Sequence, residues 1–314
     1  MEVPVYFFTG FLESGKTSFI ESILKDPSFS EGERTLLLLC EDGEIEYDYQ
    51  LLQDTNCKLM LVEDQKEFSK TFLQLCDRKY KPERVIIEWN GMWKLSDIAP
   101  DTLPKNWLIY QTVTTVDART FDMYFQNMGG YMFEMLQQTD MIVFNRSDDK
   151  TKEIVKNRRV RLINRKADIF LDFPNGQSEV YQEDLSANLD LTADVVDISE
   201  ADYGAWYFDA MEHADKYAGH TVRYLCQVYC PKGMQKNCFA AGRFTMLCCA
   251  EDITFLAMVC KAKGAEHLVD RDWYVVTAEV RDEFFPEYQG NGPVLYVKSL
   301  ERADKPEDDI CYIK

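Results

Sequence analysis

The 314-residue sequence has far fewer basic than acidic residues, and it lacks long apolar runs. It holds 35 Lys and Arg against 54 Asp and Glu, which gives a formal net charge of −19. Such an acidic surface repels a polyanion, so we expect no nucleic-acid partner, although local backbone dipoles can still bind the phosphates of a nucleotide. No segment approaches the roughly 18–20 apolar residues that span a bilayer. Internal repeats and low-complexity tracts are also absent from the sequence.

Histidine is scarce, and the common metal-binding histidine patterns are missing. His213, His220 and His267 show neither H-x-x-x-H nor H-E-x-x-H spacing, so we expect each to be structural or on the surface. The N-terminus lacks the basic stretch of a signal peptide. Ten cysteines without an export signal indicate reduced thiols rather than a disulfide framework. We therefore expect a cytoplasmic protein.

The apolar pattern divides the chain into two parts of different architecture. In residues 1–175, short apolar runs such as Val3–Phe8 and Met141–Asn145 alternate with segments of helical period. This alternation predicts an α/β domain with a doubly wound, mainly parallel sheet. We expect a polar linker over residues 176–200. In residues 201–314, five strand-like runs separated by turns predict a small β-rich barrel of the OB type.

A glycine-rich segment follows the first apolar run and opens a predicted helix. Gly10–Thr17 reads G-F-L-E-S-G-K-T, which fits the P-loop pattern G-x-x-x-x-G-K-[ST]. In such a loop, backbone N–H groups surround the β-phosphate, Lys16 bridges the β- and γ-phosphates, and the Thr17 hydroxyl reaches Mg²⁺. Glu13 replaces a more usual small residue, so we expect its side chain to point outward or to organise metal-bound water. The predicted phosphate-binding residues are Gly10, Glu13, Ser14, Gly15, Lys16, Thr17 and Ser18.

A second motif begins at the end of the apolar run Met141–Asn145. Asn145-Arg146-Ser147-Asp148 is similar to the N-K-x-D base-recognition motif of GTPases. Asp148 can accept hydrogen bonds from guanine N1–H and N2–H₂, a donor pair that adenine lacks. Asn145 would brace the loop, and the stem of Arg146 would cover the base. The alternative is a polar strand-to-helix turn that binds nothing.

Acidic turns follow two further apolar runs. Glu41 and Asp48 come where a P-loop protein places the segment that senses the γ-phosphate, and we predict that they help Thr17 to bind Mg²⁺ through the nucleotide. Glu88 ends the run 84–88, at the position of an acidic residue that reaches Mg²⁺ or its water, and the N–H of Gly91 could sense the γ-phosphate. Each turn could instead be solvated surface. Lys16 and Glu88 are the predicted catalytic residues.

Five segments of the first part together resemble the CobW-type GTPases, which are related to the metal-centre maturation GTPases HypB and UreG. They read G-F-L-E-S-G-K-T, E-D-G-E-I-x-x-D, E-W-N-G, T-V-D-A and N-R-S-D, and the resemblance covers about residues 1–175. It implies a Mg²⁺-dependent GTPase that couples nucleotide state to the handling of zinc, cobalt or another transition metal. The family's C-x-C-C metal motif would lie between the acidic turn that begins at Glu41 and the Glu88 strand, where this sequence offers only Cys57 and Cys76.

The second part is similar to the soluble C-terminal domain of the YcgQ-like permease subunits. The resemblance rests on Tyr217–Val222, Gly242–Phe244, Cys248–Asp252 and Asp272–Val275, and it covers about residues 200–305. It implies a permease-type membrane partner rather than a reaction.

This part also holds candidates for a soft-metal site. Adjacent cysteines on a strand point to opposite faces, but strand pairing could bring one of them towards two others. Buried free cysteines are the alternative interpretation. The candidate ligands are Cys230, Cys238, Cys248 and Cys249.

Three functions remain open from the sequence. The first is a slow GTPase that uses GTP and Mg²⁺, with zinc or cobalt as further candidate metals, in metal homeostasis or in the assembly of a metalloprotein client. The second is a nucleotide-dependent switch or adaptor that delivers no metal and binds a membrane or protein partner through its C-terminal domain. A nucleotide-binding protein with little hydrolysis is also compatible with the sequence, because turnover depends on sub-ångström placement of water.

Overall fold

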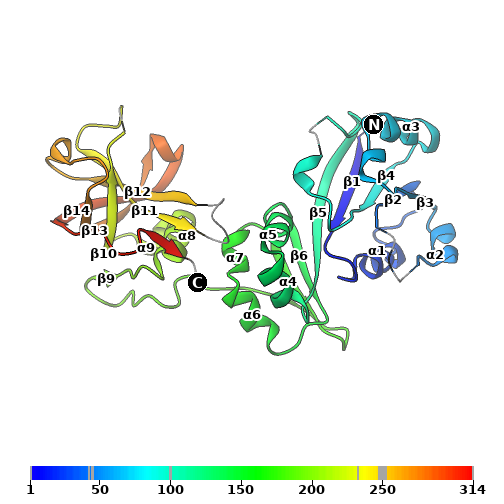
Figure 1. The fold of residues 1–314 in the computed structure, drawn as a ribbon, viewed down its shortest axis with the longest axis horizontal. Coiled ribbons are helices and arrows are strands. Elements are labelled where there is room, and N and C mark those ends of the chain that lie inside the picture. The colour runs from blue at the N-terminus through cyan, green and yellow to red at the C-terminus, as the bar shows by residue number, and fades with distance from the viewer. Residues whose placement is uncertain are drawn as a thin grey trace. The chain divides into compact units, whose positions relative to one another are not determined.

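The computed structural model describes residues 2–41, 43, 46–98, 101–231, 233–246 and 253–312. The chain divides into two compact units, Met1–Gln182 and Glu183–Lys314 (Figure 1). Each unit has its own sheet and its own hydrophobic core.

The first unit is built on an eight-stranded sheet of order β3-β2-β4-β1-β5-β6-β7-β8. All neighbouring strands are parallel except β7 and β8, which are antiparallel. The predicted mainly parallel sheet is confirmed. Its strands are β1 (Val3–Thr9), β2 (Thr35–Leu39), β3 (Cys57–Leu61), β4 (Arg84–Glu88), β5 (Trp107–Asp117), β6 (Met141–Asn145), β7 (Asp168–Asp172) and β8 (Ser178–Val180).

Helices cover both faces of this sheet, which is why its central strands are apolar throughout. In β4, Val85 and Ile87 belong to one core cluster and Ile86 belongs to another, because successive side chains of a strand point to opposite faces. Helix α1 packs Ile20 on the Ile86 side, and α3 packs Leu73 on the other. The helices are α1 (Lys16–Lys25), α2 (Tyr49–Asp54), η1 (Gln65–Glu67), α3 (Lys70–Tyr80), η2 (Leu95–Asp97), α4 (Phe121–Asn127), α5 (Gly129–Gln137), α6 (Thr151–Asn157) and α7 (Val160–Ile163).

The parallel strands bring several of the predicted site segments to one edge of the sheet. Glu88 lies beside Phe8 of β1 and Leu39 of β2, and Asn145 lies beside Asp117 of β5. The segments that follow β1, β2, β4 and β6 therefore meet at the carboxyl ends of these strands. In open α/β sheets this edge is where ligands bind.

The second unit is a β-rich sheet domain, as predicted. Its seven-stranded sheet has the order β15-β11-β12-β14-β13-β10-β9, and β11 also pairs with β10. The pairings therefore run in a closed circuit through β10, β11, β12, β14 and β13. The elements are β9 (Val196–Asp197), α8 (Tyr203–Glu212), α9 (Ala214–Tyr217), β10 (Thr221–Tyr229), β11 (Cys238–Met246), β12 (Thr254–Lys261), η4 (Ala265–His267), β13 (Trp273–Phe285), η5 (Pro286–Tyr288), β14 (Gly290–Arg302) and β15 (Ile310–Tyr312).

The range 176–200 contributes to both sheets. β8 pairs with β7 in the first unit, and β9 pairs with β10 in the second. Among the described residues, no helix combines the length and the apolarity needed to cross a membrane.

Candidate functional site

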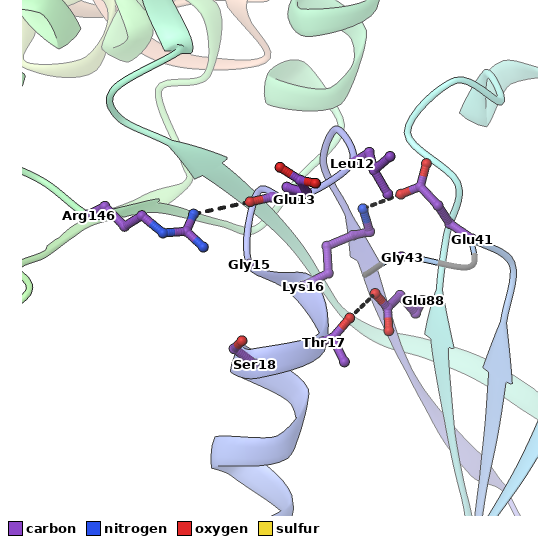
Figure 2. A pocket seen from close by; sticks show the side chains of 10 residues that line it. All are labelled: Leu12, Glu13, Gly15, Lys16, Thr17, Ser18, Glu41, Gly43, Glu88 and Arg146. Atoms are coloured by element: carbon purple, nitrogen blue, oxygen red, sulfur yellow. Dashed lines mark hydrogen bonds and ion pairs between the residues drawn. The ribbon is translucent and has the colours of Figure 1, made fainter. Parts of the chain in front are cut away.

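The P-loop wraps around the buried side chain of Lys16. The ammonium Nζ donates to the backbone carbonyls of Gly10 at 2.8 Å and Phe11 at 3.1 Å, and to Glu41 Oε2 at 2.5 Å. Figure 2 shows Lys16 directed from the start of α1 towards Glu41. These bonds hold the ammonium group of Lys16 against the P-loop, at the carboxyl ends of the strands.

Two glycines permit close approaches that a side chain would prevent. Gly15 has φ of 99°, and a Cβ there would lie 2.5 Å from Asn145 Nδ2. A Cβ on Gly91 would lie 2.3 Å from the carbonyl oxygen of Gly10. Both positions therefore require glycine. As a result, the loops after β4 and β6 lie directly against the P-loop.

A cavity of about 180 Å³ opens over the first turn of α1, and its chemistry fits an anion. Gly15 is the N-cap of this helix and supplies no side-chain cap, so the first-turn N–H groups are available to a ligand. The helix dipole adds partial positive charge at the same place. The cavity is lined by Leu12, Glu13, Gly15, Lys16, Thr17, Ser18, Glu41, Gly43, Glu88 and Arg146.

Thr17 and Glu88 form a hydroxyl–carboxylate pair at the floor of this cavity (Figure 2). Thr17 Oγ1 donates to Glu88 Oε1 at 2.9 Å. The Tyr47 hydroxyl donates to Glu88 Oε2, the other oxygen of the same carboxylate. Burial raises the pKa of Glu88, and the hydrogen bonds only partly oppose this. A buried carboxylate of this kind gains from a nearby cation, so the hard oxygen donors fit Mg²⁺.

Two acidic residues were predicted to help Thr17 bind magnesium: Glu41 pairs with Lys16, and Asp48 lies at the start of α2. Its Oδ1 accepts from the N–H groups of Gln50 at 2.8 Å and Leu51 at 3.4 Å, so it caps the helix. Its own N–H donates to Glu21 Oε1 of α1 at 2.8 Å. The carboxylate is exposed, and its role with magnesium stays a prediction.

The loop after β6 is bonded to the P-loop at two points. Asn145 Nδ2 donates to the carbonyl oxygen of Ser14 at 2.8 Å, across 131 residues of sequence. Arg146 Nη1 donates to the carbonyl oxygen of Glu13 at 3.1 Å (Figure 2). Both Glu13 and Arg146 have left-handed backbones, with φ of 61° and 56°. Such conformations persist where the surroundings hold them in place, often at functional sites.

Two side chains on β5 support these loops, although the sequence did not mark them as site residues. Arg146 Nη1 also lies 2.9 Å from Asp117 Oδ2, which receives a second bond, at 2.7 Å, from Arg119. Thr115 Oγ1 lies 2.8 Å from Ser14 Oγ, so β5 holds the P-loop from below. Thr115 and Asp117 both fall within the T-V-D-A segment 115–118. That segment was the only signal for them.

One carboxylate oxygen of Asp148 caps α6, and the other takes no part in that cap. Its Oδ1 accepts from the N–H groups of Lys150 and Thr151 and from the Thr151 hydroxyl, each at 3.0 Å. The Thr151 hydroxyl bond, with smaller contributions from the others, lowers the pKa of Asp148. The side chain is therefore a fixed carboxylate, as base recognition through Oδ2 would require.

A second cavity, of about 300 Å³, continues from the first on the side of Asn145 and Arg146. Asp172, Phe173 and Pro174, which follow β7, form part of its wall. The Ser147 N–H donates to the carbonyl oxygen of Asp172 at 2.8 Å, which joins the two loops. Sequence reasoning missed these three residues. Only their position could have indicated them, because they directly follow the strand that comes after the Asn145 loop in the chain.

The predicted soft-metal candidates do not form a described metal site. Cys248 and Cys249 lie outside the described residues. Cys230 and Cys238 are partly exposed, and partial burial raises the pKa of both thiols. In the parts of the chain that the structure describes, no three His, Cys, Asp or Glu side chains lie close enough to hold a metal ion.

Cys57 and Cys76, which lie between the Glu41 turn and the Glu88 strand, cannot together replace the missing C-x-C-C motif. Cys57 packs with Ile86 in one core cluster, and Cys76 packs with Val85 in the other. The two thiols therefore lie on opposite faces of the sheet. Burial raises the pKa of Cys57 to about 12, which disfavours the thiolate that binds metal.

Two family models together match most of the chain. Residues 4–171, just over half of the sequence, match the CobW/HypB/UreG nucleotide-binding domain. Residues 175–313 match the DUF1980 C-terminal domain.

Individual relatives are similar over part of their length. The zinc chaperone CobW of Sinorhizobium sp is 26% identical over 129 residues, which are 37% of this chain and 35% of that protein. The zinc-regulated GTPase metalloprotein activator 1 of Schizosaccharomyces pombe is 24% identical over 166 residues, 46% of this chain and 39% of that protein. The chain thus spans under two-fifths of each. Among solved structures, the Zn(II)-bound YjiA GTPase of E. coli is 17% identical with a TM-score of 0.43, covering 88% of this chain and 93% of that one.

Proposed function

Because this chain belongs to the CobW/HypB/UreG nucleotide-binding family, we propose that its first unit is a magnesium-dependent GTPase. One observation carries the proposal: the hydrogen bond from Asn145 to Ser14 places the predicted base-recognition loop against the P-loop. A single ligand with a phosphate end and a base end can therefore span the two adjoining cavities, which share Gly15, Ser18 and Arg146.

Each end of the site has residues suited to one part of GTP. Lys16 and the first-turn N–H groups of α1 would bind the phosphates, and Gly91 approaches the same loop. Thr17 and Glu88 would hold Mg²⁺, which neutralises developing charge on the phosphates when bound. The uncommitted Oδ2 of Asp148 would accept from guanine, and the stem of Arg146 would cover the base. Catalysis would then rest on positioning and charge, with slow turnover.

The hydroxyl of Thr17 provides the test of this proposal. We expect Thr17→Ala to lower the Mg²⁺-stimulated rate of GTP hydrolysis at least about tenfold, because the metal loses a ligand that a Walker-type loop supplies. Thr17→Ser keeps the hydroxyl and should stay within about threefold of the wild type. Single-turnover hydrolysis, measured over a range of Mg²⁺ concentrations, checks both variants. Equal rates for Thr17→Ala and wild type would contradict a magnesium role for this residue.

We further propose that the nucleotide cycle serves the handling of a transition metal, with zinc or cobalt as cargo. Support for zinc comes from the names of the relatives, a zinc chaperone and a zinc-regulated GTPase metalloprotein activator. The described residues contain no group of three His, Cys, Asp or Glu side chains that could hold a metal ion. The metal ligands would therefore have to include residues beyond those that the structure describes. A metalloprotein would be the client.

A competing proposal is that the chain is a nucleotide-dependent adaptor for a membrane or protein partner. The lack of a three-ligand cluster among the described residues favours it.

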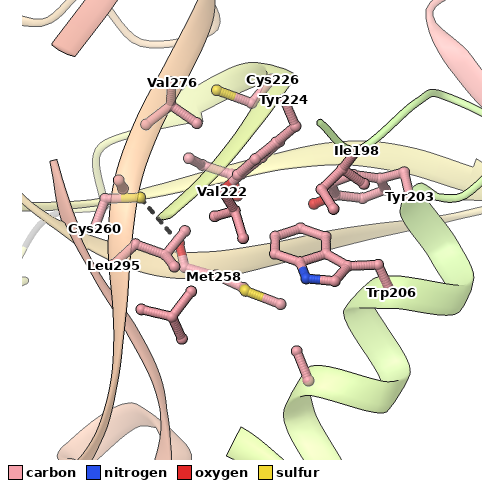
Figure 3. Close-up of a cluster of buried hydrophobic side chains, with 14 of the residues drawn as sticks. Ile198, Tyr203, Trp206, Val222, Tyr224, Cys226, Met258, Cys260, Val276 and Leu295 are labelled. Carbon is pink, nitrogen blue, oxygen red and sulfur yellow. Dashed lines mark hydrogen bonds between the residues drawn. The ribbon is translucent and has the colours of Figure 1, made fainter. Parts of the chain in front are cut away.

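The second unit would be the partner-binding module, and we propose an OB-type barrel for it. The closed circuit of strand pairings supports that assignment. In Figure 3, Tyr203 and Trp206 of α8 fill the interior beside Val222 and Met258.

Zinc titration separates metal handling from the adaptor. We expect Cys230→Ser with Cys238→Ser to change zinc affinity less than about twofold, because no group of three His, Cys, Asp or Glu side chains among the described residues could hold a metal ion. The measurement is calorimetric zinc titration of the full chain with and without GTP. If the wild type binds zinc through thiols, that result would support metal handling. A large loss of zinc affinity in the double variant would contradict the expectation that these two thiols contribute little. No binding at micromolar zinc would favour the adaptor.

A further inference from the structure

Strand β14 continues past the point where its parallel neighbour β12 ends. The pairing of the two strands stops at Lys261 of β12 and Tyr296 of β14. From Val297 to Arg302, β14 pairs with β13 alone. In an antiparallel pair, only alternate residues direct their N–H and C=O groups towards the partner strand. The last part of β14 therefore has backbone groups that face the side where β12 is absent.

A β-bulge leaves one residue of this segment outside the pairing with β13. Adjacent residues of β13 pair with Val297 and Ser299, so Lys298 is the extra residue between them. In the described part of the chain, no backbone hydrogen bond joins residues 297–302 to the turn 262–268. An open edge of this kind is where a further strand can pair.

A cavity of about 600 Å³ lies between this open edge and the turn that follows β12. The turn passes through Gly264, whose φ of 83° is left-handed, and leads into η4. Asn237, residues 261–265 and Leu268 line one side of the cavity, and residues 296–300 line the other. The cavity thus takes the place that a continuation of β12 would fill.

The charged side chains that line this cavity are all positive. Lys261, Lys263 and Lys298 belong to its lining, and none of the described Asp or Glu residues does. Lys263 is exposed and forms no ion pair with another described residue. The other two lysines have carboxylate partners on β13, Glu283 and Glu279, which are not part of the lining. In a chain of net charge −19, such a cavity favours an anionic ligand.

The cavity also has an apolar part. Leu268, Val297 and Leu300 are half-buried and pack against the core of the second unit. Successive side chains of a strand point to opposite sides. A strand added to this edge would therefore place every second side chain on the apolar groups and leave the others free to reach the lysines.

We propose that this cavity binds an extended peptide of a partner protein, in which acidic and apolar residues alternate, as an additional strand on β14. Main-chain hydrogen bonds to β14 supply the affinity, and the lysines select acidic side chains. Lysines at an open edge also oppose pairing with apolar strands, which restricts the site to acidic ones. The site would serve the proposed adaptor role, but the inference rests on the geometry of the second unit and not on GTP binding by the first.

The probe for this site is a short fluorescein-labelled peptide in which Glu and Val alternate. Its binding to the full chain is followed by fluorescence anisotropy, and saturable binding is expected. The same peptide with Lys in place of Glu should not bind. A version with backbone esters in place of its amides keeps every side chain but loses the N–H donors, so it should bind at least about tenfold more weakly. Equal affinity of the ester version would overturn strand addition, and a lack of binding by the first peptide would overturn the whole proposal.

Lys263→Glu tests the position of the site, because this lysine has no ion pair to lose within the described part of the chain. The variant should bind the Glu–Val peptide about fivefold more weakly, since an attraction becomes a repulsion. Lys305→Glu is the matched control, with the same change of charge at an exposed lysine outside the cavity lining. It should stay within about twofold of the wild type. Equal losses in the two variants, or no loss in Lys263→Glu, would overturn the assignment to this cavity.

Hydrogen–deuterium exchange identifies the strand that receives the peptide. Fragments that contain residues 297–300 should exchange more slowly when the Glu–Val peptide is bound, because their open backbone groups become paired. Protection confined to other parts of the chain would contradict pairing with β14. None of these results bears on nucleotide hydrolysis, which the Thr17 variants test separately, so a failure of this site and a failure of the proposed GTPase can be told apart.

Discussion

Replacing Lys16 with alanine is expected to weaken the binding of GTP and GDP about 100-fold or more. Lys16 places a buried ammonium group at the N-terminus of α1, and a charge-assisted hydrogen bond contributes about 1.5–3 kcal/mol. Its loss leaves only the first-turn N–H groups to bind the phosphates. A titration with fluorescent GDP and GTP analogues measures the effect. Lys25→Ala, at the exposed end of the same helix, should leave both affinities unchanged.

A loss of folding has to be separated from a loss of binding in this variant. Without Lys16, the carboxylate of Glu41 is buried with no cation beside it, which can cost about 3–5 kcal/mol. The double variant Lys16→Ala, Glu41→Gln removes that charge and should recover most of the melting temperature without recovering nucleotide binding. If the folded double variant bound GTP with wild-type affinity, Lys16 would not be the phosphate-binding residue.

The second large effect is expected from Asp148→Asn, which should reduce GTP affinity about 100-fold or more and leave ATP affinity unchanged. The Asn side chain keeps an oxygen that can cap α6, as Oδ1 does now. Its amide nitrogen replaces Oδ2 and opposes the guanine donors N1–H and N2–H₂ with another donor. Two hydrogen bonds to a charged group are lost, at about 1.5–3 kcal/mol each.

Inosine triphosphate provides a second test of guanine recognition, because its base lacks the 2-amino group of guanine. The wild type should bind it about tenfold more weakly than GTP, since one of the two hydrogen bonds to Asp148 is missing. In Asp148→Asn this difference should disappear. Asp148→Ala, which also loses the helix cap, should melt at a lower temperature than Asp148→Asn. Equal affinity of the wild type for GTP and ATP would contradict guanine recognition by Asp148.

The fold was predictable where short-range patterns determine it. The alternation of apolar runs with helical periods in residues 1–175 predicted the mainly parallel sheet, and the closely spaced strand-like runs after residue 201 predicted a β-rich second domain. Gly10–Thr17 could be identified because its whole pattern lies in one short segment directly before the helix that it opens. Such features depend on residues near one another in the sequence.

The parts of the site that sequence reasoning missed depend on strand register and on distant contacts. Tyr47 reaches Glu88 across 41 residues, and nothing near Tyr47 in the sequence indicates it. Phe173 and its neighbours join the site only because β7 lies beside β6. The separation of Cys57 and Cys76 likewise follows from the sheet that lies between them, which no spacing of cysteines reveals.

The separate interiors of the two units have an evolutionary consequence. Each described core cluster draws its residues from one unit only. Two ancestral genes could therefore have been joined in frame near residue 182, at the boundary of the two units, without a compensating change in either interior. The two matched family models meet shortly before this point, one ending at residue 171 and the other beginning at 175. Either module could have been exchanged by recombination while the other kept its fold.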